Sequence, residues 1–208
     1  MTSQTQKSKN NIDLFYSPDS KVFAKNYLKY LSNVLGKIDL DEIEIFTKTL
    51  LNARDKGATI FFAGNGGSAA TASHFANDIA IGTNDYQKPF RVISLTDNVA
   101  TLTALGNDFG YAEIFVRQLR VLGKKGDLLI CISASGNSKN LINACQYAKS
   151  VGIKTVALTA FDGGKIKSMA DEGVHVPTEF KEYGPAEDAH MILDHLVSAY
   201  LMRYIKDA

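Results

Sequence analysis

Short apolar runs alternate with longer segments of helical periodicity from residue 59 to the end of the chain. Strands are expected at residues 59–63, 90–95, 128–132, 154–159 and 173–176. Helices are expected at residues 68–80, 99–105, 111–122, 139–150, 165–170 and 185–204. Strands that are separated by helices pair in parallel through right-handed crossovers, with helices on both faces of the sheet. The alternation therefore predicts an α/β fold with a doubly wound, parallel, five-stranded sheet.

The residues before this alternation predict two leading helices and a tail. Apolar residues recur at helical spacing over 21–36 and 40–56, whereas residues 1–19 are mostly polar and end in a turn-like segment. We expect residues 1–19 to form a flexible tail and residues 20–208 to form a single domain. The two leading helices have no strand of their own to cover, so they are expected to pack beside the core or against another subunit.

Charge and hydropathy argue against several classes of partner. The chain has 23 basic and 22 acidic residues, a net charge of +1, so it has no broad positive field and no nucleic-acid partner is expected. No apolar stretch approaches the roughly 20 residues that span a bilayer. The polar amino end lacks the apolar segment of a secretion signal. We therefore expect a cytoplasmic protein that does not insert into membranes.

Two loops of small polar residues follow two of the apolar runs. The first is Gly64-Asn65-Gly66-Gly67-Ser68, and the second is Ser133-Ala134-Ser135-Gly136-Asn137-Ser138. Each loop leads into a predicted helix, so backbone N–H groups and neutral hydroxyls are available to an anion, and a phosphoester in particular. A single loop of this kind is as readily explained by a tight strand-to-helix turn. Two such loops at the same edge of a parallel sheet favour a binding site.

Nucleotide-binding alternatives are poorly supported by the same loops. The first loop supplies Gly-x-Gly, but Ala69 stands where the third glycine of a dinucleotide-binding fingerprint is expected. The chain also lacks the Gly-Lys-Ser/Thr of a nucleotide triphosphate loop. The phosphate group alone, rather than a nucleotide, is therefore the expected anion.

Histidines and carboxylates gather in two of the predicted helices. His74 and Asp78 are four residues apart and share a helix face. On the last helix Glu187 and His195 fall about 80° apart, while His190 faces another side and is left for packing or support. His74, Asp78, Glu187 and His195 could together hold zinc or a similar ion. They could equally be surface charges near helix starts, and acid/base chemistry by the same groups needs no metal.

The remaining histidine and the two cysteines are expected to be structural. His175 lies in a predicted strand without an obvious carboxylate neighbour. Cys131 and Cys145 lie in apolar settings and are expected to be buried free thiols.

Four motifs can be read in order along the chain. They are Gly64-Asn65-Gly66-Gly67-Ser68-Ala69-Ala70, His74-Phe75-Ala76, Gly106-Asn107-Asp108-Phe109-Gly110 and Ile132-Ser133-Ala134-Ser135-Gly136-Asn137-Ser138. Together they resemble the motifs of the sugar isomerase (SIS) domain, specifically of bacterial phosphoheptose isomerases. The resemblance extends over about residues 20 to 205. It implies a homotetramer with active sites between subunits. It also implies an enzyme that converts sedoheptulose 7-phosphate to an aldoheptose phosphate through an enediol intermediate. The product would supply heptose for surface polysaccharide.

The resemblance also implies roles for individual residues. His195 matches the catalytic and metal-binding histidine, His74 matches a metal ligand, and zinc is the implied ion. The implied substrate-binding residues are Asn65, Gly66, Gly67, Ser68, Asp97, Ser133, Ser135, Asn137, Ser138 and Glu187. The catalytic base falls at Asp78, and a further metal ligand falls at Glu187.

This chain departs from the family pattern at three places. Asp78 stands where the family has glutamate, Glu187 where it has glutamine, and Gly184-Pro185 where it often has Asp-Arg. A base withdrawn by about 1 Å can lose roughly a hundredfold in rate unless its neighbours compensate. A related phosphoketose is therefore an alternative substrate. A non-catalytic SIS module, which senses a phosphosugar or acts as a scaffold for replication-initiation proteins, is the alternative function.

Overall fold

The computed structural model of the chain describes residues 10–207 and contains a five-stranded sheet in which every neighbouring pair is parallel. The strands are β1 (Thr59–Gly64), β2 (Arg91–Ser94), β3 (Leu128–Ser133), β4 (Lys154–Ala160) and β5 (Glu172–Val176), in the order β2-β1-β3-β4-β5. The helices are α1 (Asn11–Phe15), α2 (Ser20–Leu35), α3 (Leu40–Asp55), α4 (Gly67–Ala80), α5 (Val99–Phe109), α6 (Ile114–Leu122), α7 (Lys139–Ser150), α8 (Gly164–Met169) and α9 (Tyr183–Lys206), with a 3-10 turn η1 (Tyr111–Glu113) before α6. The predicted α/β fold is confirmed.

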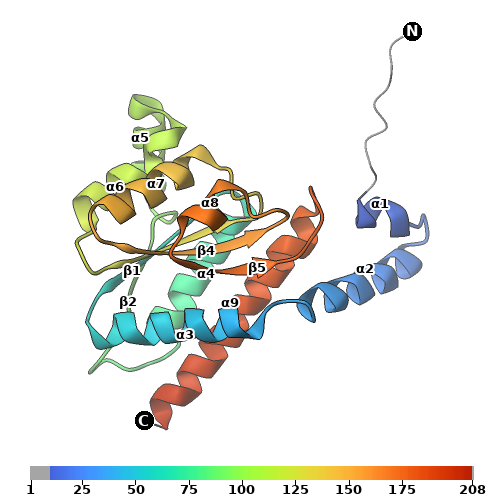
Figure 1. The fold of residues 1–208 in the computed structure, drawn as a ribbon, viewed down its shortest axis with the longest axis horizontal. Helices are drawn as coiled ribbons and strands as arrows, with labels where there is room; N and C mark the ends of the chain where they lie inside the picture. The colour runs from blue at the N-terminus through green and yellow to red at the C-terminus, as the bar shows by residue number, and fades with distance from the viewer. Residues whose placement is uncertain (1–9, 208) are drawn as a thin grey trace.

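Helices cover both faces of the sheet, as Figure 1 shows. On β1, Ile60 and Phe62 belong to a core with α3, α4 and α9, whereas Phe61 and Ala63 belong to a second core with α6, α7 and α8. Strands that are buried on both sides read as continuous apolar runs. This burial explains why β1, β3 and β4 were recognisable from the sequence.

The chain reverses its winding direction between β1 and β3. β1 is followed by α4 on one face, whereas β3 is followed by α7 on the other face. The loops after these neighbouring strands therefore diverge and leave a crevice at the carboxyl edge of the sheet. Ligands of doubly wound folds bind at this point, and both polar loops lie there.

The amino-terminal segment contains more structure than the predicted tail. Within residues 10–19 the short helix α1 forms, and the N–H of Asn11 donates to the Glu182 carboxylate at 2.8 Å. Glu182 is fully buried and also accepts from the Tyr30 hydroxyl. This long-range contact is the physical reason for the difference, because local composition does not encode it. Residues 1–9 of the predicted tail lie outside the described residues.

The two leading helices differ in how they meet the core. α3 packs against the sheet, whereas α2 buries only Val34 and extends away with α1 (Figure 1). A hydrogen bond of 2.5 Å from the Tyr27 hydroxyl to Asp188 ties α2 to the first turns of α9.

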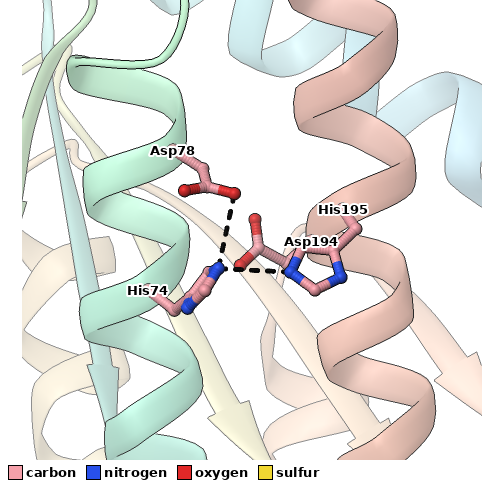
Figure 2. Close-up of side chains that lie close together, drawn as sticks. All are labelled: His74, Asp78, Asp194 and His195. Atoms are coloured by element: carbon pink, nitrogen blue, oxygen red, sulfur yellow. Dashed lines mark hydrogen bonds and ion pairs between the residues drawn. The ribbon is translucent and has the colours of Figure 1, made fainter.

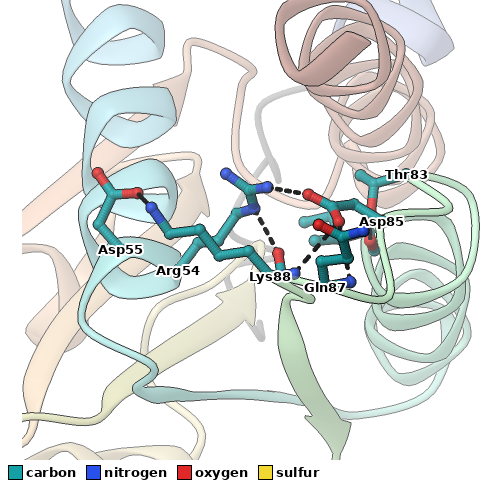
Figure 3. Close-up of polar contacts among 7 residues, drawn as sticks. Arg54, Asp55, Thr83, Asp85, Gln87 and Lys88 are labelled. Carbon is teal, nitrogen blue, oxygen red and sulfur yellow. Dashed lines mark hydrogen bonds and ion pairs between the residues drawn. The ribbon is translucent and has the colours of Figure 1, made fainter. Parts of the chain in front are cut away.

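A polar network fixes the loop between α4 and β2 to the end of α3 (Figure 3). Arg54 donates through Nε to the Lys88 carbonyl at 2.8 Å and pairs with the Asp85 carboxylate. Lys88 in turn pairs with Asp55 at 2.6 Å. The pKa of Asp85 is lowered by a backbone hydrogen bond from Lys88 and by neighbouring donors that include Arg54. The network anchors the chain just beyond the end of α4.

Over residues 10–207, none of the helices has the length and apolarity that crossing a membrane would take.

Candidate active site

The first loop connects β1 to α4 and leaves the start of that helix open. Gly66 is the N-cap residue with φ +56°, and no side chain caps the helix. A Cβ on Gly67 would lie 2.2 Å from Oε2 of Glu187. α9 therefore brings its carboxylate directly against the α4 N-terminus, where an added Cβ would displace it.

The second loop is held in a fixed shape by contacts within the sheet edge. Ser133 Oγ accepts from the N–H of Gly136 at 3.1 Å. Gly136 has φ +60°, and a Cβ there would lie 1.8 Å from the carbonyl oxygen of Gly163. Asn137 accepts from the N–H of Lys165 at 3.2 Å. Asn137 therefore braces the loop.

The two loops and α9 enclose a small polar cavity of about 150 Å³. The predicted substrate-binding residues that line it are Asn65, Ser68, Ser133, Ser135, Ser138 and Glu187. We call this cavity the hydroxyl pocket. Its lining offers neutral donors near the starts of α4 and α7, and helix starts favour anions. Burial raises the pKa of the single carboxylate, Glu187, and the charge of Asp188 raises it further.

Two residues that the sequence did not point to hold Asn65 in place. The Asn65 side chain exchanges hydrogen bonds of 2.8 and 3.0 Å with Asn140. Its oxygen also accepts from the Tyr111 hydroxyl at 2.7 Å. Asn140 is buried at the start of α7. An asparagine in the first turn of the helix that follows the polar loop was the available signal.

Asp97 lies apart from the hydroxyl pocket within this chain. Its carboxylate accepts from the hydroxyl of Ser73 on α4. It lines a different groove of about 750 Å³, between α4, β2, α5 and α6. The predicted role of Asp97 beside the sugar stays a prediction.

A cluster of two imidazoles and two carboxylates lies further along the α4–α9 helix pair (Figure 2). It comprises His74 and Asp78 from α4 with Asp194 and His195 from α9, and one ligand atom of each lies within 4.8 Å of the others. Nε2 of His74 is 3.2 Å from Nε2 of His195 and 3.4 Å from Oδ2 of Asp78. The structure thus brings together three of the four predicted metal ligands. We call the four residues the histidine–aspartate cluster.

Asp194 forms the buried floor of this cluster. Its side chain is fully buried, and Oδ1 accepts from the Ser198 hydroxyl at 3.0 Å. Oδ2 has no hydrogen-bond partner in the part of the chain that the structure describes. Burial raises the pKa of Asp194 to about 7, with a further contribution from the charge of Asp78. A single acid among the apolar positions of α9 was the sequence signal for this residue.

Glu187, the fourth predicted ligand, is in the hydroxyl pocket instead. It precedes His195 by eight residues, which is about 12 Å along a helix axis. In this chain its place in the cluster is taken by Asp194. The prediction considered only the rotation about the helix, and the rise along its axis separates the two side chains.

The histidine–aspartate cluster has the donors and spacing that a divalent metal needs. A tetrahedral ion with bonds of about 2.0–2.1 Å places its ligand atoms about 3.3 Å apart. The separation of 3.2 Å between Nε2 of His74 and Nε2 of His195 matches this value. The unpartnered buried oxygen of Asp194 is a further sign, because such atoms are rarely left without a partner. The group could therefore bind a metal ion.

The remaining histidines and the cysteines have structural surroundings. His190 is fully buried on a different side of α9 from His195, and burial lowers its pKa to about 4. His175 is 3.1 Å from the hydroxyl of Thr159 through Nδ1. Cys131 and Cys145 are free and buried, as predicted.

Known proteins resemble the chain in sequence over most of its length. A family model described as the SIS domain matches residues 23–160. The phosphoheptose isomerase of Aliarcobacter butzleri is 37% identical over 175 residues, which are 83% of this chain and 92% of that protein. The probable phosphoheptose isomerase of Thermoplasma acidophilum is 34% identical over 178 residues, which are 86% of this chain and 97% of the relative.

Solved structures agree with the sequence relatives. Phosphoheptose isomerase GmhA from Neisseria gonorrhoeae superposes with a TM-score of 0.77 at 31% identity, covering 87% of this chain and 97% of that one. A phosphoheptose isomerase from Francisella tularensis gives a TM-score of 0.78 at 26% identity, with 86% and 96% covered. The chain therefore belongs to the SIS domain family, with phosphoheptose isomerases as relatives over most of its length.

Proposed function

We propose that this protein is a phosphoheptose isomerase that converts sedoheptulose 7-phosphate to an aldoheptose 7-phosphate. The observation that carries the proposal is that a pocket of neutral hydroxyl donors lies where the two polar loops meet α9, and that α4 and α9 bear a cluster of imidazoles and carboxylates. The substrate has its phosphate at one end and its carbonyl at the other. One end needs an anion site, and the other needs groups that move a proton.

The hydroxyl pocket is assigned to the phosphate end. Ser133, Ser135 and Ser138 line it, and Ser138 is the N-cap residue of α7, so neutral hydroxyls lie beside a helix start that no side chain caps. Asn65 and Ser68 come from the opposite loop and are assigned to the sugar hydroxyls. The hydrogen bonds from Asn140 and Tyr111 keep the Asn65 amide oriented.

The histidine–aspartate cluster is assigned to the carbonyl end. Asp78 acts as the base that removes a proton from C1 of the ketose, which gives the enediol. The proton is returned to C2, and His195 exchanges protons with the sugar oxygens during these steps. The side chain of Asp78 is 22% exposed, so a sugar can reach it.

Zinc is the metal that we assign to this protein. Two imidazoles and a carboxylate are the ligand types that zinc binds in catalytic sites. His74 and His195 would hold it together with a carboxylate, for which Asp78 and Glu187 were the candidates from the sequence. Bound there, the ion supplies a positive charge that polarises the sugar carbonyl.

A homotetramer with active sites between subunits is part of the proposal. Within one chain, Glu187 of the hydroxyl pocket and His195 of the cluster are about 12 Å apart along α9. A second subunit packed against α9 would bring a pocket and a cluster closer together than this. α9 also exposes apolar side chains beside His195, notably Ile192, Leu196 and Tyr200. Exposed apolar faces of this kind are typical of subunit interfaces. We further propose a cytoplasmic location and a role in supplying heptose for surface polysaccharide.

The test is conversion of the sugar by the purified full-length protein. Proton NMR of sedoheptulose 7-phosphate is expected to show the anomeric signal of an aldoheptose phosphate, and Asp78→Asn and His195→Ala are expected to abolish it. Conversion of a different phosphoketose only would reassign the substrate. Binding of phosphosugars without conversion of any of them would favour the non-catalytic SIS module.

A further inference from the structure

The histidine–aspartate cluster contains one donor more than a catalytic metal requires. A tetrahedral zinc that takes part in catalysis uses three protein ligands and keeps one position open for the substrate. His74 and His195 supply two of the three ligands through facing Nε2 atoms. The third ligand must then be one of the two carboxylates, Asp78 or Asp194.

The two carboxylates differ in how far they are buried. Asp194 is fully buried, and its Oδ2 lacks a hydrogen-bond partner among residues 10–207. Asp78 is partly exposed, and its Oδ1 accepts from the Asn77 amide at 3.1 Å. A buried oxygen without a partner carries a free-energy cost that a bound cation removes. A sugar can approach Asp78 but not Asp194.

A supporting hydrogen bond orients Asp194 toward the imidazoles. The Ser198 hydroxyl, one turn further along α9, donates to Oδ1 at 3.0 Å. This bond leaves Oδ2 free, and Figure 2 shows the carboxylate pointing from α9 toward His74. Metal-binding carboxylates are commonly held by such a second hydrogen bond.

We propose that Asp194 is the carboxylate that completes the metal site with His74 and His195, so that Asp78 is left free to act as the base. The ligand is a zinc-like divalent ion held by two imidazoles and one carboxylate. Glu187 stays in the hydroxyl pocket and does not bind the metal. The role of Asp78 in this arrangement rests on the proposed isomerase function, whereas the ligand set can be tested without substrate.

The test is cobalt(II) binding to the chelator-treated full-length protein, followed by visible absorption and by competition with a chromophoric chelator. Asp194→Asn is expected to weaken cobalt binding at least tenfold and to alter the absorption band, because one ligand is lost. Asp78→Asn and Glu187→Gln are expected to bind cobalt within about threefold of the wild type. His74→Ala is the positive control for ligand loss.

Three results would overturn the ligand set. They are wild-type affinity and spectrum in Asp194→Asn, a loss in Asp78→Asn or Glu187→Gln as large as that in Asp194→Asn, and no cobalt binding by the wild type. Circular dichroism checks the fold of each variant. If Asp194→Asn does not fold, Ser198→Ala decides, because it removes only the orienting hydrogen bond: weakening by several-fold supports the proposal, and wild-type affinity contradicts it. Metal binding through Asp194 in a protein that converts no sugar would leave this ligand set intact and contradict the proposed function.

Discussion

The two ends of the α4–α9 helix pair differ in how completely their polar groups are satisfied. At the hydroxyl pocket, Asn65 and Ser133 already have partners within the protein. At the histidine–aspartate cluster, two imidazoles face each other and one buried carboxylate oxygen has no partner within residues 10–207. The pocket is a preformed binding surface, whereas the cluster is arranged for groups that come from outside: a cation, a sugar and a proton.

The largest expected effect is on catalysis by the cluster. Asp78→Asn and His195→Ala should each lower kcat by about 10²–10⁴-fold, because each removes a group that transfers a proton. KM should change by no more than a few-fold, because the hydroxyl pocket is untouched. Steady-state kinetics with sedoheptulose 7-phosphate measure both values.

Asp207→Asn, at the exposed end of α9, serves as the control and should retain wild-type kinetics. A rise in KM without a fall in kcat in Asp78→Asn or His195→Ala would show that the cluster binds substrate rather than reacting with it.

The second prediction concerns acid stability, which depends on His190 in the shared helix α9. Burial lowers the pKa of this imidazole to about 4 from 6.5, so the folded state holds it neutral. The contribution of the neutral His190 imidazole to the free energy of unfolding is complete above pH 6.5 and is lost as the pH falls toward 4. The loss is about 3 kcal/mol of unfolding free energy. Urea unfolding at pH 7 and pH 4 should show the fall.

His190→Leu should remove most of this difference between pH 7 and pH 4. His195→Ala is the matched control and should keep it, because that imidazole is exposed. A wild-type pH slope in His190→Leu would contradict the assignment.

The third prediction tests whether the hydroxyl pocket is as rigid as its contacts indicate. Gly136→Ala should lower the unfolding free energy by about 2 kcal/mol or more, because φ is positive and the Cβ would meet the Gly163 carbonyl at 1.8 Å. Gly106→Ala is the control, since its Cβ would meet nothing within 4 Å. That change should be neutral or stabilise by about 0.5–1 kcal/mol. Equal melting temperatures for the two variants would show that the loop adapts.

The smallest expected effect is on binding of the phosphate group. Ser135→Ala should weaken binding of the phosphosugar by about tenfold, the value of one hydrogen bond to a charged group, with kcat preserved. Calorimetry against inorganic phosphate and against the sugar phosphate measures this. Ser150→Ala, at the other end of α7, is the control. An unchanged affinity in Ser135→Ala would remove this hydroxyl from the phosphate site.

The sequence predicted the fold and the hydroxyl pocket better than the cluster, and the reason is physical. Strands buried on both faces and polar loops beside them are local features, and six predicted residues line the pocket. Asn140, Tyr111 and Asp194 act through contacts between distant segments. Glu187 was assigned to the cluster because helical rotation was considered without the rise along the axis.

In the proposed reaction, a phosphosugar held by the hydroxyl pocket loses a proton to the histidine–aspartate cluster. The most direct measurement is deuterium uptake from heavy water into C1 of sedoheptulose 7-phosphate, followed by proton NMR in wild type and Asp78→Asn. Uptake is expected with the wild type, and it is expected to be lost in Asp78→Asn and suppressed by excess inorganic phosphate. Uptake or conversion by Asp78→Asn at the wild-type rate would contradict this role of Asp78.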